Sequence, residues 1–366
     1  MRTAIIHYWL VNRRGGERVL EELCALFPDA DIFTHVHDPQ ALGSPVIAKH
    51  NVRTTFVARL PWANRLYRHY LPLMPLALEE LDLRGYDLVL SSEAGPAKGV
   101  ITAPEALHLC YCHSPMRYAW DLYHEYVAGF SRIRRAFVAP LLHYMRLWDA
   151  ASADRVDCFV ANSGYVAQRI RKCYRRESRV VHPPVDLRLA RHDLPREDFY
   201  LFVGELVPYK RADLAVEACN RLGRRLVVIG GGPLEKKLRS LAGPTVSFLG
   251  RQPDAVVAGH YARCRALLFP GPEDFGITPV EGMASGAPVL ALGRGGALET
   301  VQDGRTGLFF QEQSVEGLAE AIRTLERDGV SLSAEAIAAH AVPWEAARFR
   351  EAMTRLIDEA LAGARW

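Results

Sequence analysis

Short apolar runs alternate with segments of helical periodicity along most of the chain, and this alternation constrains the fold more than any other feature. Apolar runs bounded by turn residues are typical of buried parallel strands. We predict strands at residues 3–8, 31–34, 88–91, 107–112 and 158–161, and again at 200–203, 226–229, 246–249, 267–269 and 289–292. Strands that alternate with helices form doubly wound parallel sheets, so we expect an α/β fold.

The chain has 366 residues, which is enough for two domains of ordinary size. Pro183 and Pro184 interrupt the alternation, and paired prolines stiffen a connector and prevent a helix there. We therefore predict one Rossmann-like domain at residues 1–183 and a second at residues 184–343.

Composition narrows the class of protein. The net charge is only +3, which argues against nucleic acid as the main partner. The seven cysteines are an odd number scattered through apolar segments, so we expect reduced thiols. The chain enters a predicted strand at residue 3, and no apolar run approaches the ~20 residues that cross a bilayer. These features predict a cytoplasmic protein.

A strand, a loop, a helix and a second strand are predicted within residues 269–292. Thr278 is the expected helix N-cap, with Pro279 at the first helical position. Glu273 then lies in the loop and Glu281 in the first helical turn, at the sheet edge where open α/β folds bind ligands. The alternatives are structural: Glu281 completes a capping box with Thr278, and Glu273 is a solvated charge.

The whole string resembles the family 4 retaining glycosyltransferases, which have the GT-B fold of two Rossmann-like domains facing a cleft. The likeness rests on two glutamates eight residues apart, with Phe275–Gly276 after the first and Ala-Ser-Gly-x-Pro-Val after the second. The resemblance implies that Glu273 contacts the donor sugar and that Glu281 holds the ribose hydroxyls. It also implies donor contacts from Phe275, Gly276, Ile277 and Thr278, and a last helix at residues 344–366 that crosses back to the N-terminal domain.

A second string, residues 111–118 followed by Trp120, Asp121 and Tyr123, is similar to bacterial O-antigen and exopolysaccharide mannosyltransferases of the same family. The resemblance places His113 against the donor sugar. The alternative is a packed structural histidine at the end of a strand.

Four glycine-containing loops follow predicted strands and complete the expected donor site. Gly15 and Gly16 precede a helical pattern at residues 18–26, where backbone N–H groups can approach an anion. By resemblance, Lys210 holds the donor diphosphate, Arg251 lies at the base, and Arg294 lies near the sugar and phosphates. Glu205 stands where the family usually has arginine. Either Arg211, Arg294 or an arginine of the Arg13–Arg14 pair replaces that cation, or the affinity for the diphosphate is lower than usual in the family.

Two strings with metal-binding residue types, Asp29-x-Asp31 and His35-x-His37-Asp38, lack further clustered ligands, so we expect no metal and no cofactor. Residues 51–75 and 130–148 combine arginines with apolar side chains and contain no acidic residue. Such stretches are typical of helices on anionic lipid, although ordinary surface helices share the pattern. We therefore expect a peripheral association with the cytoplasmic membrane.

The predicted function is that of a metal-independent retaining hexosyltransferase with catalytic residues His113, Glu273 and Lys210. The resemblance implies GDP-mannose as donor and a polyprenyl-diphosphate-linked saccharide as acceptor, in the synthesis of a bacterial surface polysaccharide such as lipopolysaccharide. The alternatives are a transferase that uses a UDP-sugar, a GT-B-fold nucleotide-sugar epimerase, and an inactive binding protein.

Overall fold

The computed structural model describes residues 1–363, which divide into two compact units. The first unit contains residues 1–184 and residues 349–363, and the second contains residues Val185–Arg348. The chain therefore leaves the first unit just after Pro184 and returns to it within its last helix.

The first unit is built on a seven-stranded sheet with the order β3-β2-β1-β4-β5-β6-β7, and its strand pairs are parallel. Its strands are β1 (Thr3–His7), β2 (Asp31–Thr34), β3 (Val52–Thr54), β4 (Leu88–Glu93), β5 (Leu107–Cys112), β6 (Cys158–Ala161) and β7 (Arg179–Val180). Because β1 pairs with both β2 and β4, the direction in which strands are added reverses between β1 and β4.

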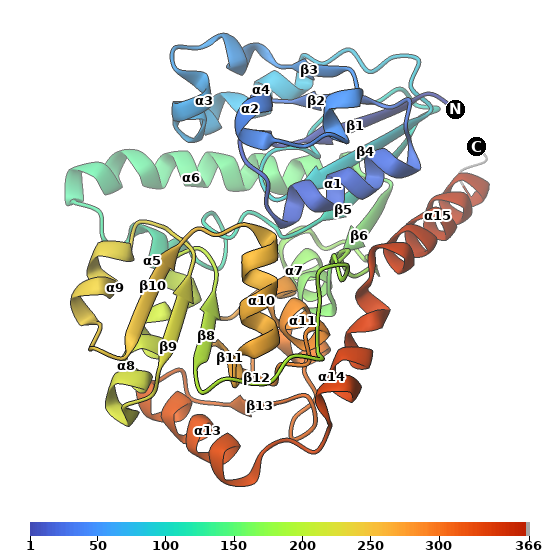
Figure 1. Cartoon of the computed structure of the whole chain (residues 1–366). Coiled ribbons are helices and arrows are strands. Elements are labelled where there is room, and N and C mark those ends of the chain that lie inside the picture. The colour runs from blue at the N-terminus through green and yellow to red at the C-terminus, as the bar shows by residue number, and fades with distance from the viewer. Residues whose placement is uncertain (364–366) are drawn as a thin grey trace. The chain divides into compact units, whose positions relative to one another are not determined.

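Helices cover both faces of this sheet (Figure 1): α1 packs in the buried cluster that holds Leu109, and α7 packs in the cluster that holds Cys110, on the other face. The helices are α1 (Gly15–Leu26), α2 (Pro39–Leu42), α3 (Ala63–Leu66), α4 (Met74–Glu79), α5 (Tyr123–Ala128), α6 (Arg132–Ser152), α7 (Gly164–Tyr174) and the C-terminal α15 (Ala346–Gly363). Phe349 and Met353 of α15 pack in the same buried cluster as strand residues Leu109 and Val160. The last helix is therefore part of the first unit's core.

The second unit is built on a six-stranded parallel sheet with the order β10-β9-β8-β11-β12-β13. Its strands are β8 (Tyr200–Val203), β9 (Leu226–Ile229), β10 (Val246–Gly250), β11 (Ala266–Phe269), β12 (Val289–Leu292) and β13 (Gly307–Phe310). Its helices are α8 (Ala212–Leu222), α9 (Glu235–Leu241), α10 (Asp254–Arg263), α11 (Ile277–Ala284), α12 (Ala297–Thr300), α13 (Val315–Asp328) and α14 (Ala334–Ala341). Here the order of strands reverses between β8 and β11.

Burial on both faces explains why these strands have continuous apolar sequences. In β12, Leu290 packs in the cluster on one face of the sheet, and Val289 and Ala291 pack in the cluster on the other. Successive side chains of a strand point to opposite faces, so a strand covered by helices on both sides needs apolar residues at every position. The predicted α/β class with two parallel sheets is confirmed.

The local predictions were wrong in three places. The short edge strands β3 and β7 and the strand β13 were not predicted, although the other predicted strands are present. Helix α11 begins at Ile277 after Gly276, so Thr278 is not the N-cap. Residues 51–75 do not form one helix, because Pro61 and Pro72 interrupt the segment and Trp62 has a left-handed backbone conformation with φ of 50°.

A buried ionic cluster joins the end of β4 to α6. Lys98, Glu93 and Asp149 are each 0% exposed. The Lys98 ammonium pairs with Asp149 and lies 3.3 Å from Glu93 Oε1, while Trp120 Nε1 donates to Asp149 Oδ2 at 2.7 Å. Burial lowers the pKa of Lys98, but the two carboxylates raise it more, so its net pKa lies above the usual value. Lys98 is therefore a structural cation.

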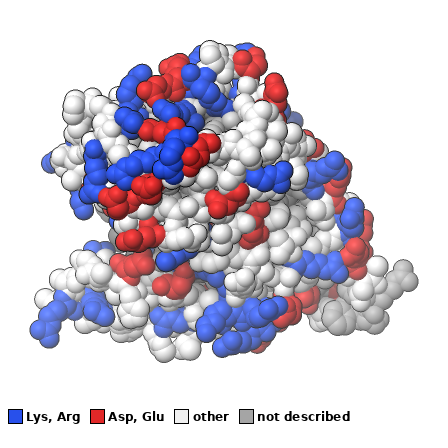
Figure 2. Space-filling view, turned by 90° about the horizontal axis from the view of Figure 1, so that it is seen from below, with Lys and Arg blue, Asp and Glu red and all other residues white. Residues whose placement is uncertain are grey.

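Charges on the surface are mixed in sign. Figure 2 shows Lys and Arg side chains interspersed with Asp and Glu side chains over one face of the molecule. On α13, for example, Glu316 pairs with both Arg221 and Arg323. This mixing agrees with the small net charge. Among residues 1–363, no helix is long and apolar enough to cross a membrane.

Candidate active site

In open parallel sheets, ligands bind beyond the carboxyl ends of the strands, at the point where the strand order reverses. In the second unit that point lies between β8 and β11. The loop after β8 carries Lys210, and the loop after β11 carries Glu273. In the first unit it lies between β1 and β4, and Gly15, Gly16 and His113 follow strands of that sheet.

Lys210 and Glu273 form an ion pair at the reversal point of the second sheet. Their side chains are only 17% and 20% exposed, so both charges are partly withdrawn from water. Gly204, at the end of β8, leaves room for the lysine, because a Cβ there would lie 3.2 Å from Lys210 Cδ. The two loops therefore present one cation and one carboxylate side by side.

The electrostatic surroundings of Lys210 are dominated by carboxylates. Burial is the largest single influence and lowers the pKa of Lys210, but Glu273, Tyr209 and Glu205 together raise it more, so the net pKa lies above its usual value. Lys210 is therefore a permanent cation. The Glu205 carboxylate, which stands where the family usually has arginine, makes this loop less positive and so less attractive to a diphosphate.

Glycines allow the loops around this ion pair to approach one another backbone to backbone. A Cβ on Gly271 would lie 2.5 Å from Tyr209 O and 2.6 Å from Lys210 Cα. A Cβ on Gly296, after β12, would lie 2.3 Å from Phe275 Cα, and Gly296 N donates to Glu273 O at 2.9 Å. The positions of Lys210 and Glu273 therefore depend on close loop packing that side chains would prevent.

Replacing Gly271 by alanine is expected to displace the loop that carries Lys210 and to lower donor affinity by roughly tenfold, because overpacking costs about 1–3 kcal/mol. Titration calorimetry with nucleotide-diphosphate sugars measures the change. Gly259→Ala is the matched control, since a Cβ in the middle of α10 would meet only Arg263 Nη1 at 3.4 Å. Equal affinity of parent and Gly271→Ala would contradict this prediction.

Glu281 is the fifth residue of α11, two positions further into the helix than predicted. Tyr261 of α10 donates its hydroxyl to Glu281 Oε2 at 3.2 Å, and burial, followed by the Glu281 charge, raises the pKa of Tyr261. Pro279 occupies the third helical position, where its missing N–H costs nothing, because the first four N–H groups of a helix have no intrahelical acceptor. Because Gly276 and not Thr278 is the N-cap, the capping-box explanation for Glu281 is wrong.

The remaining predicted donor residues differ in how accessible their side chains are to a ligand. Arg211 has a left-handed backbone conformation, and its Nη2 donates to Asp213 Oδ2 at 2.9 Å, so its charge is already paired with the first turn of α8. Arg294 and Arg251 are exposed. The Phe275 side chain lies in the apolar core, so only its backbone can serve a ligand.

In the first unit, His113 follows β5 and takes part in a buried polar chain. Its Nε2 lies 2.9 Å from Ser92 Oγ at the end of β4. Burial and then the neighbouring His7 lower the pKa of His113 to about 3, so the ring is neutral. Gly15 and Gly16 are the first two residues of α1, and a Cβ on Gly16 would lie 2.3 Å from the Tyr8 hydroxyl.

Sequence reasoning missed four residues that lie beside these site residues: His7, Ser92, Tyr261 and Glu17. The Glu17 carboxylate lies 3.7 Å from His7 Nε2. His7 is the last residue of β1 and Ser92 the last but one of β4, and the two are directly paired in the register of these adjacent strands. Polar residues at the carboxyl ends of predicted strands are a usable signal. Which of those ends would be neighbours required the strand order.

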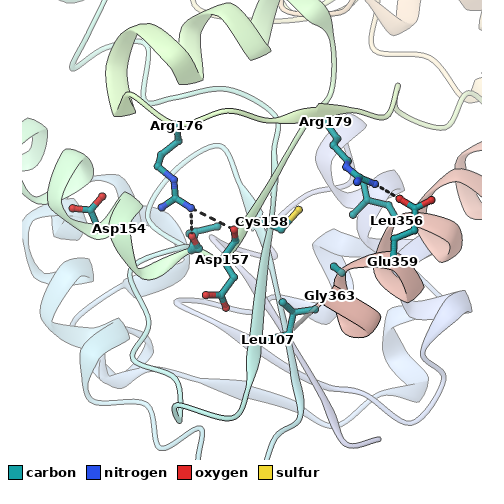
Figure 3. Close-up of a pocket in the computed structure, with 11 residues that line it drawn as sticks. Leu107, Asp154, Asp157, Cys158, Arg176, Arg179, Leu356, Glu359 and Gly363 are labelled. Atoms are coloured by element: carbon teal, nitrogen blue, oxygen red, sulfur yellow. Dashed lines mark hydrogen bonds and ion pairs between the residues drawn. The ribbon is translucent and has the colours of Figure 1, made fainter. Parts of the chain in front are cut away.

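A cavity in the first unit lies away from these residues, and no metal centre is found among residues 1–363. Within residues 1–363, no three His, Cys, Asp or Glu side chains cluster as a metal site would require. A cavity of about 450 Å³ lies at the opposite, amino edge of the first sheet (Figure 3). Its two arginines are engaged, Arg176 with the main-chain carbonyl of Val156 and Arg179 with Glu359.

Two models of known protein families together match nearly the whole chain. Residues 13–189 match the family described as Glycosyltransferase Family 4, and residues 190–341 match the one described as Glycosyl transferases group 1. The chain belongs to glycosyltransferase family 4. The first match contains Gly15, Gly16 and His113, and the second contains Lys210, Glu273 and Glu281, so both groups of site residues lie in family-defining regions.

Curated relatives of this family 4 chain include two mannosyltransferases. A GDP-mannose-dependent alpha-(1-6)-phosphatidylinositol monomannoside mannosyltransferase of Mycobacterium tuberculosis is 33% identical over 180 residues, which is 44% of this chain and 46% of the relative. The O-antigen chain mannosyltransferase C of Escherichia coli is 30% identical over 190 residues, 46% of this chain and 51% of the relative. The chain spans about half the length of the curated relatives it matches.

Solved structures share the GT-B fold with this family 4 chain over almost its whole length. Sucrose-phosphate synthase from Thermosynechococcus elongatus superimposes with a TM-score of 0.76 at 18% identity, covering 99% of this chain and 100% of that one. Anabaena HepE in complex with UDP gives a TM-score of 0.70 at 17% identity, covering 98% and 100%. At these identities the likeness shows the fold.

Proposed function

We propose that this chain is a retaining hexosyltransferase that moves mannose from GDP-mannose to a saccharide acceptor carried on polyprenyl diphosphate, in bacterial surface polysaccharide synthesis. The observation that carries the proposal is the Lys210–Glu273 pair at the strand-order reversal of the second sheet, with Glu281 on the adjoining helix. The two mannosyltransferase relatives support the choice of sugar and base.

The ion pair suits the charge changes of glycosyl transfer. Cleavage of the bond between sugar and diphosphate develops negative charge on the phosphate and positive charge on the sugar. Lys210 and the N-terminus of α11 stabilise the leaving phosphate. As the diphosphate takes over the ammonium of Lys210, the Glu273 carboxylate is released to accept hydrogen bonds from sugar hydroxyls, and Glu281 accepts from the ribose.

The remaining residues position the reacting groups. His113 contacts the sugar, and the phosphate oxygen that leaves takes the proton of the acceptor hydroxyl on the same face of the sugar. No protein nucleophile is required by this route, and the configuration at the anomeric carbon is retained. The backbone N–H groups at Gly15 and Gly16 are placed to meet an anionic group at the start of α1.

A donor screen tests the proposal. In calorimetric titrations, GDP-mannose should bind with higher affinity than UDP-glucose or UDP-GlcNAc. Sugar transfer should also persist after exhaustive chelation, because Lys210 and the N-terminus of α11 supply the positive charge. Preference for a UDP-sugar would replace the donor assignment. Interconversion of nucleotide sugars without an acceptor would indicate an epimerase, and binding without turnover an inactive protein. Activity lost on chelation and restored by Mn²⁺ or Mg²⁺ would contradict metal independence.

The proposed lipid-linked acceptor requires that the protein contact a membrane surface. The first unit has exposed apolar and basic side chains suited to that contact. Ile133 and Phe137 on the first turns of α6 are each 76% exposed, and Trp62 is 75% exposed. The arginines close to them in sequence are also exposed: Arg59, Arg65, Arg68, Arg134 and Arg135. Apolar side chains that enter the headgroup region beside arginines that meet anionic lipid are typical of peripheral binding.

Neutralising these five arginines with glutamine should weaken binding to anionic vesicles at low salt without changing donor affinity. Each arginine near an anionic leaflet contributes about 1 kcal/mol, and salt screens the attraction. Vesicle sedimentation with anionic and neutral lipids measures the partition. The matched control neutralises five exposed residues of the second unit, Arg191, Lys236, Lys237, Arg239 and Arg305. Equal partition of parent and first-unit variant would mean that these are ordinary surface segments.

A further inference from the structure

His113 is the end of a chain of four polar side chains from four different segments. His7 Nδ1 lies 3.1 Å from Ser92 Oγ, and Ser92 Oγ lies 2.9 Å from His113 Nε2. On the far side of His7, its Nε2 faces Glu17 Oε1 at 3.7 Å. Ser92 is fully buried, and His7 and Glu17 are each 1% exposed.

The single proton of the Ser92 hydroxyl restricts which ring nitrogens of His7 and His113 can carry protons. The Ser92 hydroxyl has one proton and lies between two ring nitrogens, so it donates to one and accepts an N–H from the other. If Ser92 donates to His7, then His113 carries its proton on Nε2 and its Nδ1 has a free lone pair. If Ser92 donates to His113, then His113 carries its proton on Nδ1.

Glu17 decides between the two directions. A distance of 3.7 Å is too long for a hydrogen bond, but a buried carboxylate there favours an N–H over a lone pair on His7 Nε2. His7 protonated on Nε2 has an acceptor at Nδ1, which takes the Ser92 proton. The second oxygen of Glu17 is held in place, since it accepts from the Arg14 backbone N–H at 2.8 Å in the capping box of α1.

The outcome at His113 is a nitrogen left for a ligand. The ring is only partly buried, and Nδ1 has no hydrogen-bond partner within residues 1–363. The low pKa of His113, caused by burial and then by His7, keeps the ring neutral, so the tautomer alone decides whether Nδ1 donates or accepts.

We infer that Ser92, His7 and Glu17 are positioning residues that hold His113 in the Nε2–H tautomer, so that Nδ1 accepts a hydrogen bond from a sugar hydroxyl. The inference rests on the proposed function for the identity of the ligand, but the tautomer itself is a property of the free protein. The selected ligand group is a hydroxyl donor, and a group that only accepts, such as a carbonyl or a phosphate oxygen, is disfavoured at this nitrogen.

The test is a nitrogen–proton correlation spectrum of histidine-labelled protein without ligand, with the His113 signals assigned by their absence in His113→Gln. The parent should show the Nε2–H tautomer. Glu17→Gln should reverse it: the amide oxygen keeps the bond to the Arg14 N–H, the amide N–H₂ then faces His7 Nε2, and every proton in the chain shifts. Ser92→Ala should give a mixture of tautomers.

Ser91→Ala is the matched control, because Ser91 is also a buried β4 serine whose Oγ bonds a histidine, His108 Nε2 at 2.9 Å. It should change the His108 signals alone. In the transfer assay, Ser92→Ala and Glu17→Gln should each lower kcat by roughly fivefold, equivalent to one hydrogen bond of ~1 kcal/mol, with the donor KM unchanged. Ser91→Ala should keep the kcat of the parent.

An Nδ1–H tautomer in the parent, or an unchanged tautomer in both Glu17→Gln and Ser92→Ala, would overturn the inference. If the spectra follow the prediction but the parent transfers no sugar, the proposed function fails and the positioning of His113 stands. If the parent transfers sugar and the spectra disagree, only this inference fails.

Discussion

Replacing Lys210 by alanine is expected to weaken donor binding by roughly 10- to 100-fold while the protein stays folded, because a hydrogen bond to a charged group contributes about 1.5–3 kcal/mol. Two effects add. The variant loses the ammonium that meets the diphosphate, and it leaves the Glu273 carboxylate, now unpaired, beside the same phosphates. The loss should therefore lie toward the upper end of that range, and kcat should fall with it because the leaving group carries more charge in the transition state.

Calorimetry and initial rates measure both effects, and Lys237→Ala, at an exposed lysine of α9, is the surface control. A second variant works in the opposite direction. Glu205→Gln removes a carboxylate that raises the pKa of Lys210, so it should tighten donor binding. If Lys210→Ala binds the donor as tightly as the parent, Lys210 does not contact the donor, whatever the result for Glu205→Gln.

Replacing Lys98 by alanine should destabilise the first unit by about 3–5 kcal/mol, since removing one partner of a buried ion pair leaves an uncompensated buried charge. Lys98 is 0% exposed between Glu93 and Asp149, which are also 0% exposed. Burial raises the pKa of Glu93, and Lys98 opposes that rise. Without Lys98, two buried carboxylates repel each other, and one must take up a proton on folding.

Urea unfolding followed by tryptophan fluorescence measures this loss, with Lys49→Ala as the exposed control. The double variant Glu93→Gln/Lys98→Ala removes one of the two carboxylates together with the lysine. It should therefore be more stable than Lys98→Ala alone, which is a non-additive result expected only for groups that interact. A loss below about 1 kcal/mol in Lys98→Ala, within the range of exposed salt bridges, would show that the cluster is hydrated.

The amino-acid sequence alone determined the α/β class and the positions of Lys210 and Glu273 at the carboxyl edge of the second sheet. Each strand buried on both faces needs a continuous apolar run, so the strands at residues 200–203 and 289–292 are visible without any knowledge of their neighbours. Lys210 and Glu273 each follow such a run by a few residues. Their placement at the carboxyl edge is therefore local information, and their sequence strings match the family.

Helix ends were less well determined. Thr278 and Pro279 form a good N-terminal signal, yet α11 begins at Ile277. Gly276, with φ of 90°, turns the chain earlier, because the loop must pass backbone to backbone against Gly296. Tertiary packing outweighs a capping preference of ~1 kcal/mol. The stretch at residues 51–75 failed as one helix for the same kind of reason, since two prolines and the left-handed Trp62 interrupt it.

Only the tertiary structure decided which distant residues meet. Lys98 looks like a surface lysine in the sequence, and its partner Asp149 lies 51 positions away. His7, Ser92 and His113 lie at or just beyond the carboxyl ends of three different strands, and they come together because β1 pairs with β4 and β4 with β5. Apolar periodicity fixes that a strand is buried, but it carries no information about which strand lies beside it. That choice depends on the packing of the whole sheet, and the polar chain that orients His113 exists only once the choice is made.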